Sequence, residues 1–276
     1  MLAERLGPVT RLTLNRPERR NPLSARCIEE LLAGVAAAEA DAEVRVVVIR
    51  GSGTAFSSGY GLVPEDERPG ERERPATIQD DIDAMRGHGA EWARVWGCRL
   101  PVIAQVHGWC LAGGTDLALH CDLVVAAADA KIGFPPVRSM GVPPTHMWLY
   151  HVGPQWAKRL LLTGDTLTGA EAAAIGLALV AVPAEVLDDY VLALAGRMAM
   201  VGRDLLIANK QVVNHGVELM GRSQLQQVSA VYDAAAHTLP EVRAFSARVA
   251  EVGLRDAVRE RDARFSDPLP GPTVTR

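Results

Sequence analysis

Two glycine-rich segments, each following an apolar run, are the parts of this sequence best suited to binding a polarised or negatively charged oxygen. Residues 51–62 follow the β-branched run 44–49, and residues 108–114 follow the apolar run 101–106. Glycine lets backbone N–H groups approach a ligand oxygen closely, although such turns are also common in simple packing. Neither segment contains GxxxxGK[ST] or GxGxxG, so these motifs give no sign of nucleoside phosphate binding.

A single carboxyl group follows the second glycine-rich segment. Asp116 falls in the first turn of the helix that begins after Gly114. There it could act as a general base, or it could be an ordinary polar residue stabilised by the helix dipole. Between residues 132 and 151 the sequence has no Asp or Glu. The residues alone leave both of these roles of Asp116 open.

The hydrophobic pattern predicts the elements that would position these segments. Alternation or continuous β-branched character predicts strands, and apolar residues spaced i, i+3, i+4 predict helices. The predicted strands are residues 9–14, 44–49, 101–106 and 123–127, and the predicted helices in the same region are residues 24–41, 78–96 and a short helix through Leu119. This order of strands and helices is typical of a wound α/β fold.

Beyond residue 144 the strand signal nearly vanishes. Helical patterns occupy residues 145–162, 169–176, 184–201, 217–237 and 241–252. We therefore expect an α/β core over residues 1–200 and a helical C-terminal region over residues 201–276. The charged, proline-rich tail from residue 255 is expected to be loosely ordered, and the charged run 64–75 to be a solvated loop.

Composition narrows the function classes. The chain has 276 residues, 48% of them hydrophobic, and a net charge of −4, which makes nucleic acid and anionic membranes poor candidate partners. No secretory signal is visible, and no stretch reaches the roughly 20 apolar residues of a membrane span. The four cysteines form no CxxC pair, and the seven histidines show no HExxH spacing. These features predict a cytoplasmic protein with reduced thiols and no metal site.

Several motifs in register resemble the enoyl-CoA hydratase/isomerase (crotonase) superfamily. Leu12 to Ser24 is similar to the family's opening strand and loop, and Ala55 to Leu62 to its first oxyanion segment. Pro101 to Asp122 resembles the second oxyanion segment. Later landmarks of the family match residues 157–165 and 171–177. The resemblance covers nearly all of the front of the chain and much of the back.

The resemblance implies a fold, a site and a substrate. The fold would be a spiral of ββα turns with a helical trimerisation region at the C-terminus, giving a homotrimer or homohexamer. The backbone N–H groups of Tyr60 and Gly113 would bind the thioester oxygen of an acyl-CoA and stabilise an enolate. Coenzyme A would be part of the substrate, and no separate cofactor would be needed. The candidate contacts for the CoA moiety are Arg20, Ser58, Gly61 and Leu62.

The sequence departs from the family at the groups that handle protons. Hydratases of the family use two glutamates, and this chain has Asp116 and Pro136 at those positions; Gly61 also stands where the family usually has Asp. The open alternatives are a hydratase with one unusual carboxylate, a double-bond isomerase that needs only one base, and a non-catalytic acyl-CoA-binding protein. With one carboxylate near the site, we expect proton abstraction to survive better than water addition.

Overall fold

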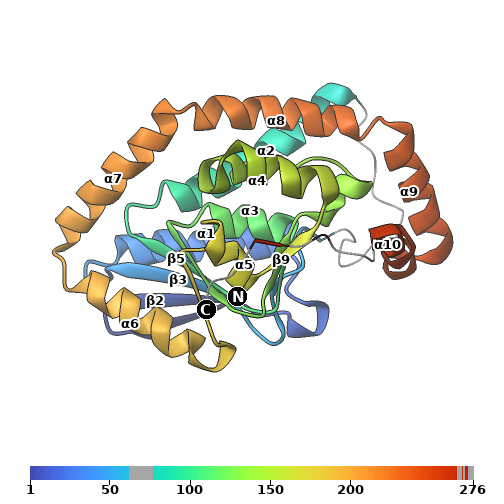
Figure 1. Ribbon diagram of the computed structural model, residues 1–276. Helices are drawn as coiled ribbons and strands as arrows, with labels where there is room; N and C mark the ends of the chain where they lie inside the picture. Colours follow the sequence, from blue (N-terminus) through green and yellow to red (C-terminus); the bar gives the residue numbers. More distant parts are fainter. Residues whose placement is uncertain (62–76, 266–268, 270, 273–276) are drawn as a thin grey trace.

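Two sheets form the centre of the computed structural model, which describes residues 1–61, 77–265, 269, 271 and 272 (Figure 1). The six-stranded sheet has the order β1-β2-β3-β5-β7-β10, and the four-stranded sheet has the order β4-β6-β8-β9. Apart from the antiparallel pairs β1/β2 and β8/β9, neighbouring strands are parallel. The strands are β1 (Leu2–Leu6), β2 (Val9–Leu14), β3 (Val46–Gly51), β4 (Ala55–Ser57), β5 (Val102–Val106), β6 (Trp109–Leu111), β7 (Leu123–Ala127), β8 (Lys131–Gly133), β9 (Thr166–Thr168) and β10 (Val180–Val182).

The chain builds these sheets as a spiral. Each turn adds one long strand to the first sheet, one short strand to the second, and then a helix. β3 and β4 lead to α2 (Ile78–Trp96), and β5 and β6 lead to α3 (Gly113–Leu119). The expected ββα spiral is therefore confirmed. Because β4, β6 and β8 are parallel neighbours, the turns that follow them leave the second sheet at one edge.

Local sequence explains the first layers of the core. Ser24 accepts a hydrogen bond from the Cys27 amide at 3.2 Å and caps α1 (Ala25–Ala40). That helix buries an apolar stripe spaced i, i+3, i+4, i+7, made of Ile28, Leu31, Leu32 and Val35. The four β-branched residues 46–49 are fully buried in β3, as expected for a central parallel strand covered on both faces.

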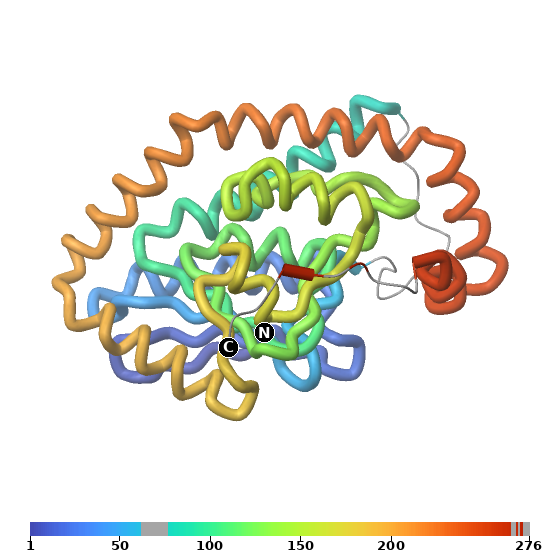
Figure 2. Tube along the Cα trace, viewed as in Figure 1, coloured from blue at the N-terminus to red at the C-terminus, as the bar shows by residue number. Residues whose placement is uncertain are grey.

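The C-terminal helices wrap around the outside of the sheets (Figures 1 and 2). After α4 (Trp148–Thr163) and α5 (Gly169–Ala174) come α6 (Leu187–Ala199), α7 (Arg203–Leu219), α8 (Arg222–Ala236), α9 (Pro240–Val252) and α10 (Leu254–Asp262). Lys210 fastens α7 to the core through the Leu100 carbonyl at 3.0 Å and the Asp122 carboxylate at 2.8 Å. α8 lies along α2.

Parts of this region differ from the sequence expectation. The helix expected over residues 217–237 begins only at Arg222, after Gly221 in a left-handed conformation with φ 88°, and α7 extends over residues 203–219, most of which were not expected to be helical. Where a loosely ordered tail is expected, the chain forms α10, whose last residue Asp262 binds Arg138 at 3.0 Å. The charged run 64–75 lies outside the described residues. Among the helices that the structure does describe, none has the length and apolar character of a membrane span.

Candidate active site

The turns that follow β4 and β6 touch each other at the edge of the second sheet. The two strands pair through Ala55 with Trp109 and through Ser57 with Cys110. A methyl group on Gly59 would lie 2.7 Å from the Ala112 Cβ and 3.1 Å from the Gly113 nitrogen. Only glycine fits at such a distance. The structure thus brings together the two segments in which the sequence predicts oxyanion donors.

Two backbone N–H groups at this contact have no backbone partner. Within the described residues, no backbone hydrogen bond uses the amide of Tyr60 or of Gly113. Gly113 is the first residue of α3, so its amide has no acceptor inside the helix. The preceding residue, Ala112, has φ 52° and ψ −125°, a conformation that costs a non-glycine residue about 1–3 kcal/mol. This strained backbone lies where the donor is presented.

Asp116 lies one turn further along α3, with a carboxyl group that is almost completely buried. Its Oδ1 accepts a hydrogen bond from Thr145 at 2.7 Å, and its Oδ2 accepts one from the Tyr60 hydroxyl at 3.0 Å. Burial raises the pKa of Asp116 to about 6, and the hydrogen bonds from Thr145 and Tyr60 offset part of that rise. A carboxyl group with this pKa exchanges protons readily near neutral pH.

The Tyr60 side chain is a part of the site that the sequence did not reveal. Its ring lies against Gly113, because a methyl group there would be 2.7 Å from two ring carbons. The ring stacks on His88 with centroids 4.3 Å apart, and the hydroxyl accepts a hydrogen bond from Trp92 at 2.8 Å. Burial raises the pKa of Tyr60 well above its usual value, so the phenol is neutral and donates to Asp116. In the sequence, the i, i+4 spacing of His88 and Trp92 places both on one face of the predicted helix, and this was the available sign that they contact the same partner.

The predicted CoA contacts Arg20 and Ser58 lie together beside these turns. The Ser58 amide donates to the Arg20 carbonyl at 2.9 Å, and the exposed guanidinium of Arg20 lies 5.7 Å from the centre of the Trp109 ring. Asn21, which the sequence did not single out, fixes this loop. Its side chain donates to the carbonyls of Ser52 and Ala55 at 2.8 Å each.

The other two predicted CoA contacts belong to the next part of the first turn. Gly61 donates its amide to the Leu23 carbonyl at 3.1 Å, so this N–H already has a partner. Leu62 lies outside the described residues. Of the four predicted CoA contacts, Arg20 and Ser58 are therefore the two with exposed polar groups beside the turns that follow β4 and β6.

A second buried carboxyl group approaches the region from α8. Asp233 is 4% exposed, and its Oδ1 accepts a hydrogen bond from the Val142 amide at 2.8 Å. Burial raises the pKa of Asp233 to about 6, and the charge of Asp116 adds to that rise. Asp233 is thus a second buried carboxyl group whose ionisation is affected by the charge of Asp116. The stretch around Pro136 has none, as its sequence shows, but a distant helix supplies one.

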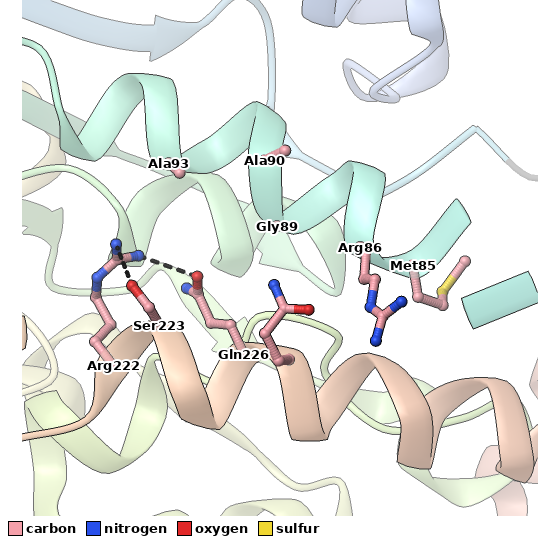
Figure 3. A pocket seen from close by; sticks show the side chains of 9 residues that line it. Met85, Arg86, Gly89, Ala90, Ala93, Arg222, Ser223 and Gln226 are labelled. Carbon is pink, nitrogen blue, oxygen red and sulfur yellow. Dashed lines mark hydrogen bonds between the residues drawn. The ribbon is translucent and has the colours of Figure 1, made fainter. Parts of the chain in front are cut away.

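A small cavity of about 160 Å³ lies between α2 and α8 (Figure 3). It is lined by Met85, Arg86, Gly89, Ala90, Ala93, Arg222, Ser223, Gln226 and Gln227. In Figure 3, Arg222 reaches Gln226, and the hydrogen bond between them is 3.0 Å long. Gln226 in turn contacts the buried His120 of α3 at 3.0 Å. This polar lining fastens α8 to α3, and neither Asp116 nor Gly113 borders the cavity.

Comparison with known proteins gives a consistent result. The family model "Enoyl-CoA hydratase/isomerase" matches residues 4–245. The 2,3-dehydroadipyl-CoA hydratase of Escherichia coli K12 is 32% identical over 231 residues, which are 82% of this chain and 86% of that protein. Crystal structures of an enoyl-CoA hydratase from Mycobacterium smegmatis and an enoyl-CoA hydratase/isomerase from Xanthobacter autotrophicus Py2 align with TM-scores of 0.89 and 0.88. Their identities are 39% and 36%, and the alignments cover 96% of this chain and 94% and 98% of theirs.

Proposed function

The chain belongs to the enoyl-CoA hydratase/isomerase family, and from that premise we propose that it binds an acyl-CoA thioester and catalyses proton transfer next to its carbonyl group. One observation carries the proposal. Two backbone N–H groups that have no backbone partner among the described residues meet where the turns after β4 and β6 touch, and a buried carboxyl group follows one of them by a single helical turn.

In this mechanism the thioester oxygen accepts hydrogen bonds from the Tyr60 and Gly113 amides. Asp116 in its ionised form removes a proton from C2, and the electron pair of that C–H bond moves to form the enolate. The negative charge collects on the oxygen, where each donor of such a hole contributes roughly 2.7–4 kcal/mol. The phosphates of CoA would extend along the rim formed by Arg20 and Ser58.

In deuterated buffer, the protein is expected to exchange the C2 protons of butyryl-CoA faster than it hydrates crotonyl-CoA. Exchange needs one base and the oxyanion hole, whereas hydration also needs a second group that handles the proton of water. Mass spectrometry of the thioester and loss of enoyl absorbance measure the two rates. Hydration faster than exchange would reverse this ordering, and tight acyl-CoA binding without either reaction would favour a non-catalytic binder.

The exposed face of α7 supports an oligomeric assembly. Its large apolar residues that face solvent in the single chain are Leu205, Val212, Val213 and Leu219, and Met220 follows directly. An apolar surface of this kind is normally covered by a partner. We propose that copies of this chain cover it in a homotrimer or homohexamer.

Light scattering at micromolar concentration is expected to give three or six times the 29.6 kDa mass of one chain. Val212→Glu on this face should lower that mass, because it would place a charge in an apolar interface. The exposed Asp204→Asn on the same helix should leave it unchanged. A wild-type protein that is monomeric under these conditions would refute the assembly.

A further inference from the structure

We infer that Asp233 of α8 is the second proton-handling group of this site, and that it acts on the water added to C3 of an enoyl-CoA. The inference rests on the proposed function and extends it from proton exchange to hydration. It assigns a role to a carboxyl group that lies far along the chain from both glycine-rich turns.

The buried face of α8 is polar, which is unusual for a helix that covers a core. Its buried residues are Arg222, Gln226, Ser229, Ala230, Asp233 and Ala234. Three of the larger apolar residues of the same helix, Val228, Val231 and Tyr232, are 41–68% exposed, and Leu225 is half-buried. Burying a polar group is unfavourable unless it has a partner. Arg222 and Gln226 have partners in Glu218 and His120, whereas Asp233 accepts a hydrogen bond at Oδ1 alone among the described residues.

The segment 142–145 connects the two carboxyl groups. The Val142 amide donates to Asp233 at 2.8 Å, and the Thr145 hydroxyl donates to Asp116 at 2.7 Å. Three residue steps span at most about 10 Å even in extended chain, which limits the separation of the two anchoring points. Within the described part of the chain, Asp233 Oδ2 receives no hydrogen bond, although the residue is 4% exposed. This oxygen is not among the fully enclosed side-chain atoms that lack a partner, so it keeps a small contact with solvent through which a water molecule can reach it.

His237 links Asp233 to the solvent. Its Nε2 lies 3.6 Å from Asp233, one turn earlier on α8, and its Nδ1 lies 2.8 Å from Asp81 of α2. The His237 side chain is 32% exposed, so a proton can pass through it. Asp81, His237 and Asp116 are the charged groups that act on the ionisation of Asp233. Among the described residues, no cluster of three or more His, Cys, Asp or Glu side chains could hold a metal ion.

Geometry divides the two steps between the carboxyl groups. Asp116 lies three residues after Gly113 in α3, so we assign it to C2 of a thioester held at the Gly113 amide, and we assign Asp233, which approaches through Val142, to C3. Ionised Asp233 takes a proton from water while the water oxygen bonds to C3. The C2–C3 π pair moves toward the carbonyl to give the enolate. Protonated Asp116 then delivers its proton to C2. Asp233 returns the proton taken from water to solvent through His237, and Asp116 takes up a proton from solvent before the next turnover.

Asp233→Asn separates hydration from exchange. The Asn oxygen can still accept the Val142 hydrogen bond, but the amide cannot take a proton. Hydration of crotonyl-CoA is expected to fall about 100-fold, with KM within threefold of wild type and the acidic limb of the pH–rate profile lost. C2 exchange of butyryl-CoA is expected to stay within threefold. Asp204→Asn, an exposed acid-to-amide change at the start of α7, is the control and should alter neither rate.

Three results would overturn the inference. Wild-type hydration in Asp233→Asn with an unchanged pH profile would show that the carboxyl group has no role. An equal loss of hydration and exchange would mean that Asp233 only supports the structure. A wild-type protein that neither exchanges nor hydrates would remove the proposed function, and this inference with it.

Discussion

Asp116→Asn is expected to reduce C2-proton exchange of butyryl-CoA by about a thousandfold, within the range that general acid–base groups contribute. The amide has nearly the shape of the carboxyl group and can still accept from Thr145, so the pocket should keep its form. The Kd of the thioester, measured by calorimetry, should therefore stay within about threefold of wild type. Exchange that persists in this variant would show that another group is the base.

The pH dependence of the wild-type enzyme tests the same assignment. Asp116 removes a proton only when ionised, and its pKa is about 6, so exchange should rise with pH through that value and level off above it. The Thr145 hydrogen bond lowers that pKa. Thr145→Val should therefore move the rising limb to higher pH, whereas a base other than Asp116 would leave the limb in place.

Asp116→Asn should also make the protein more stable at high pH. Because burial raises the folded-state pKa of Asp116 above its unfolded value, the folded state keeps a proton between about pH 4 and pH 6 that the unfolded chain has released. The free energy of unfolding thus falls as pH rises through this window and stays lower above it. At pH 8, Asp116→Asn should gain about 1–3 kcal/mol in urea unfolding. Below pH 4 the difference should vanish.

Local patterns predicted the elements that carry the first half of the spiral. The strand 9–14 and the helix 78–96 coincide with β2 and α2, because hydrophobic spacing and caps act over a few residues. The three-residue strands β4, β6 and β8 gave no such signal. They exist because the long strands place them side by side, and three residues are too few to show a period.

In the candidate site too, some features could be predicted from the sequence and others depend on how distant elements pack. The glycine-rich segments after the apolar strands could be predicted from the pattern, and the resemblance to the family assigned Tyr60 and Gly113 within them. The Tyr60 hydroxyl bond to Asp116 and the approach of Asp233 could not, because each depends on how distant elements pack. A search of the sequence around Pro136 could find no carboxylate, since the nearby one comes from α8. Side-chain partners across the fold are set by tertiary packing rather than by local spacing.

Gly113 offers the second large effect, because its amide and its missing side chain have separate roles. Gly113→Ala keeps the N–H but adds a methyl group that would lie 2.7 Å from the Tyr60 ring, so the ring must move and its bond to Asp116 must weaken. We expect a loss of about 100-fold in C2 exchange, as for a misplacement near 1 Å. Gly113→Pro also removes the donor and should lose about a thousandfold, since one oxyanion donor contributes 10²–10³ in rate.

Two further variants separate these effects from general damage. Tyr60→Phe removes the hydroxyl without moving the ring, so it isolates the hydrogen bond to Asp116 from the crowding that Gly113→Ala causes. Gly196→Ala in α6, where an added methyl group meets nothing within 4 Å, should leave exchange unchanged and stabilise the fold by about 0.5–1 kcal/mol. Gly113→Pro changes the backbone as well as the donor, because proline restricts the conformation of the residue before it and Ala112 has φ 52°. A folded Gly113→Pro protein that exchanges C2 protons at the wild-type rate would therefore exclude this amide from the oxyanion hole, whatever the Ala variant does.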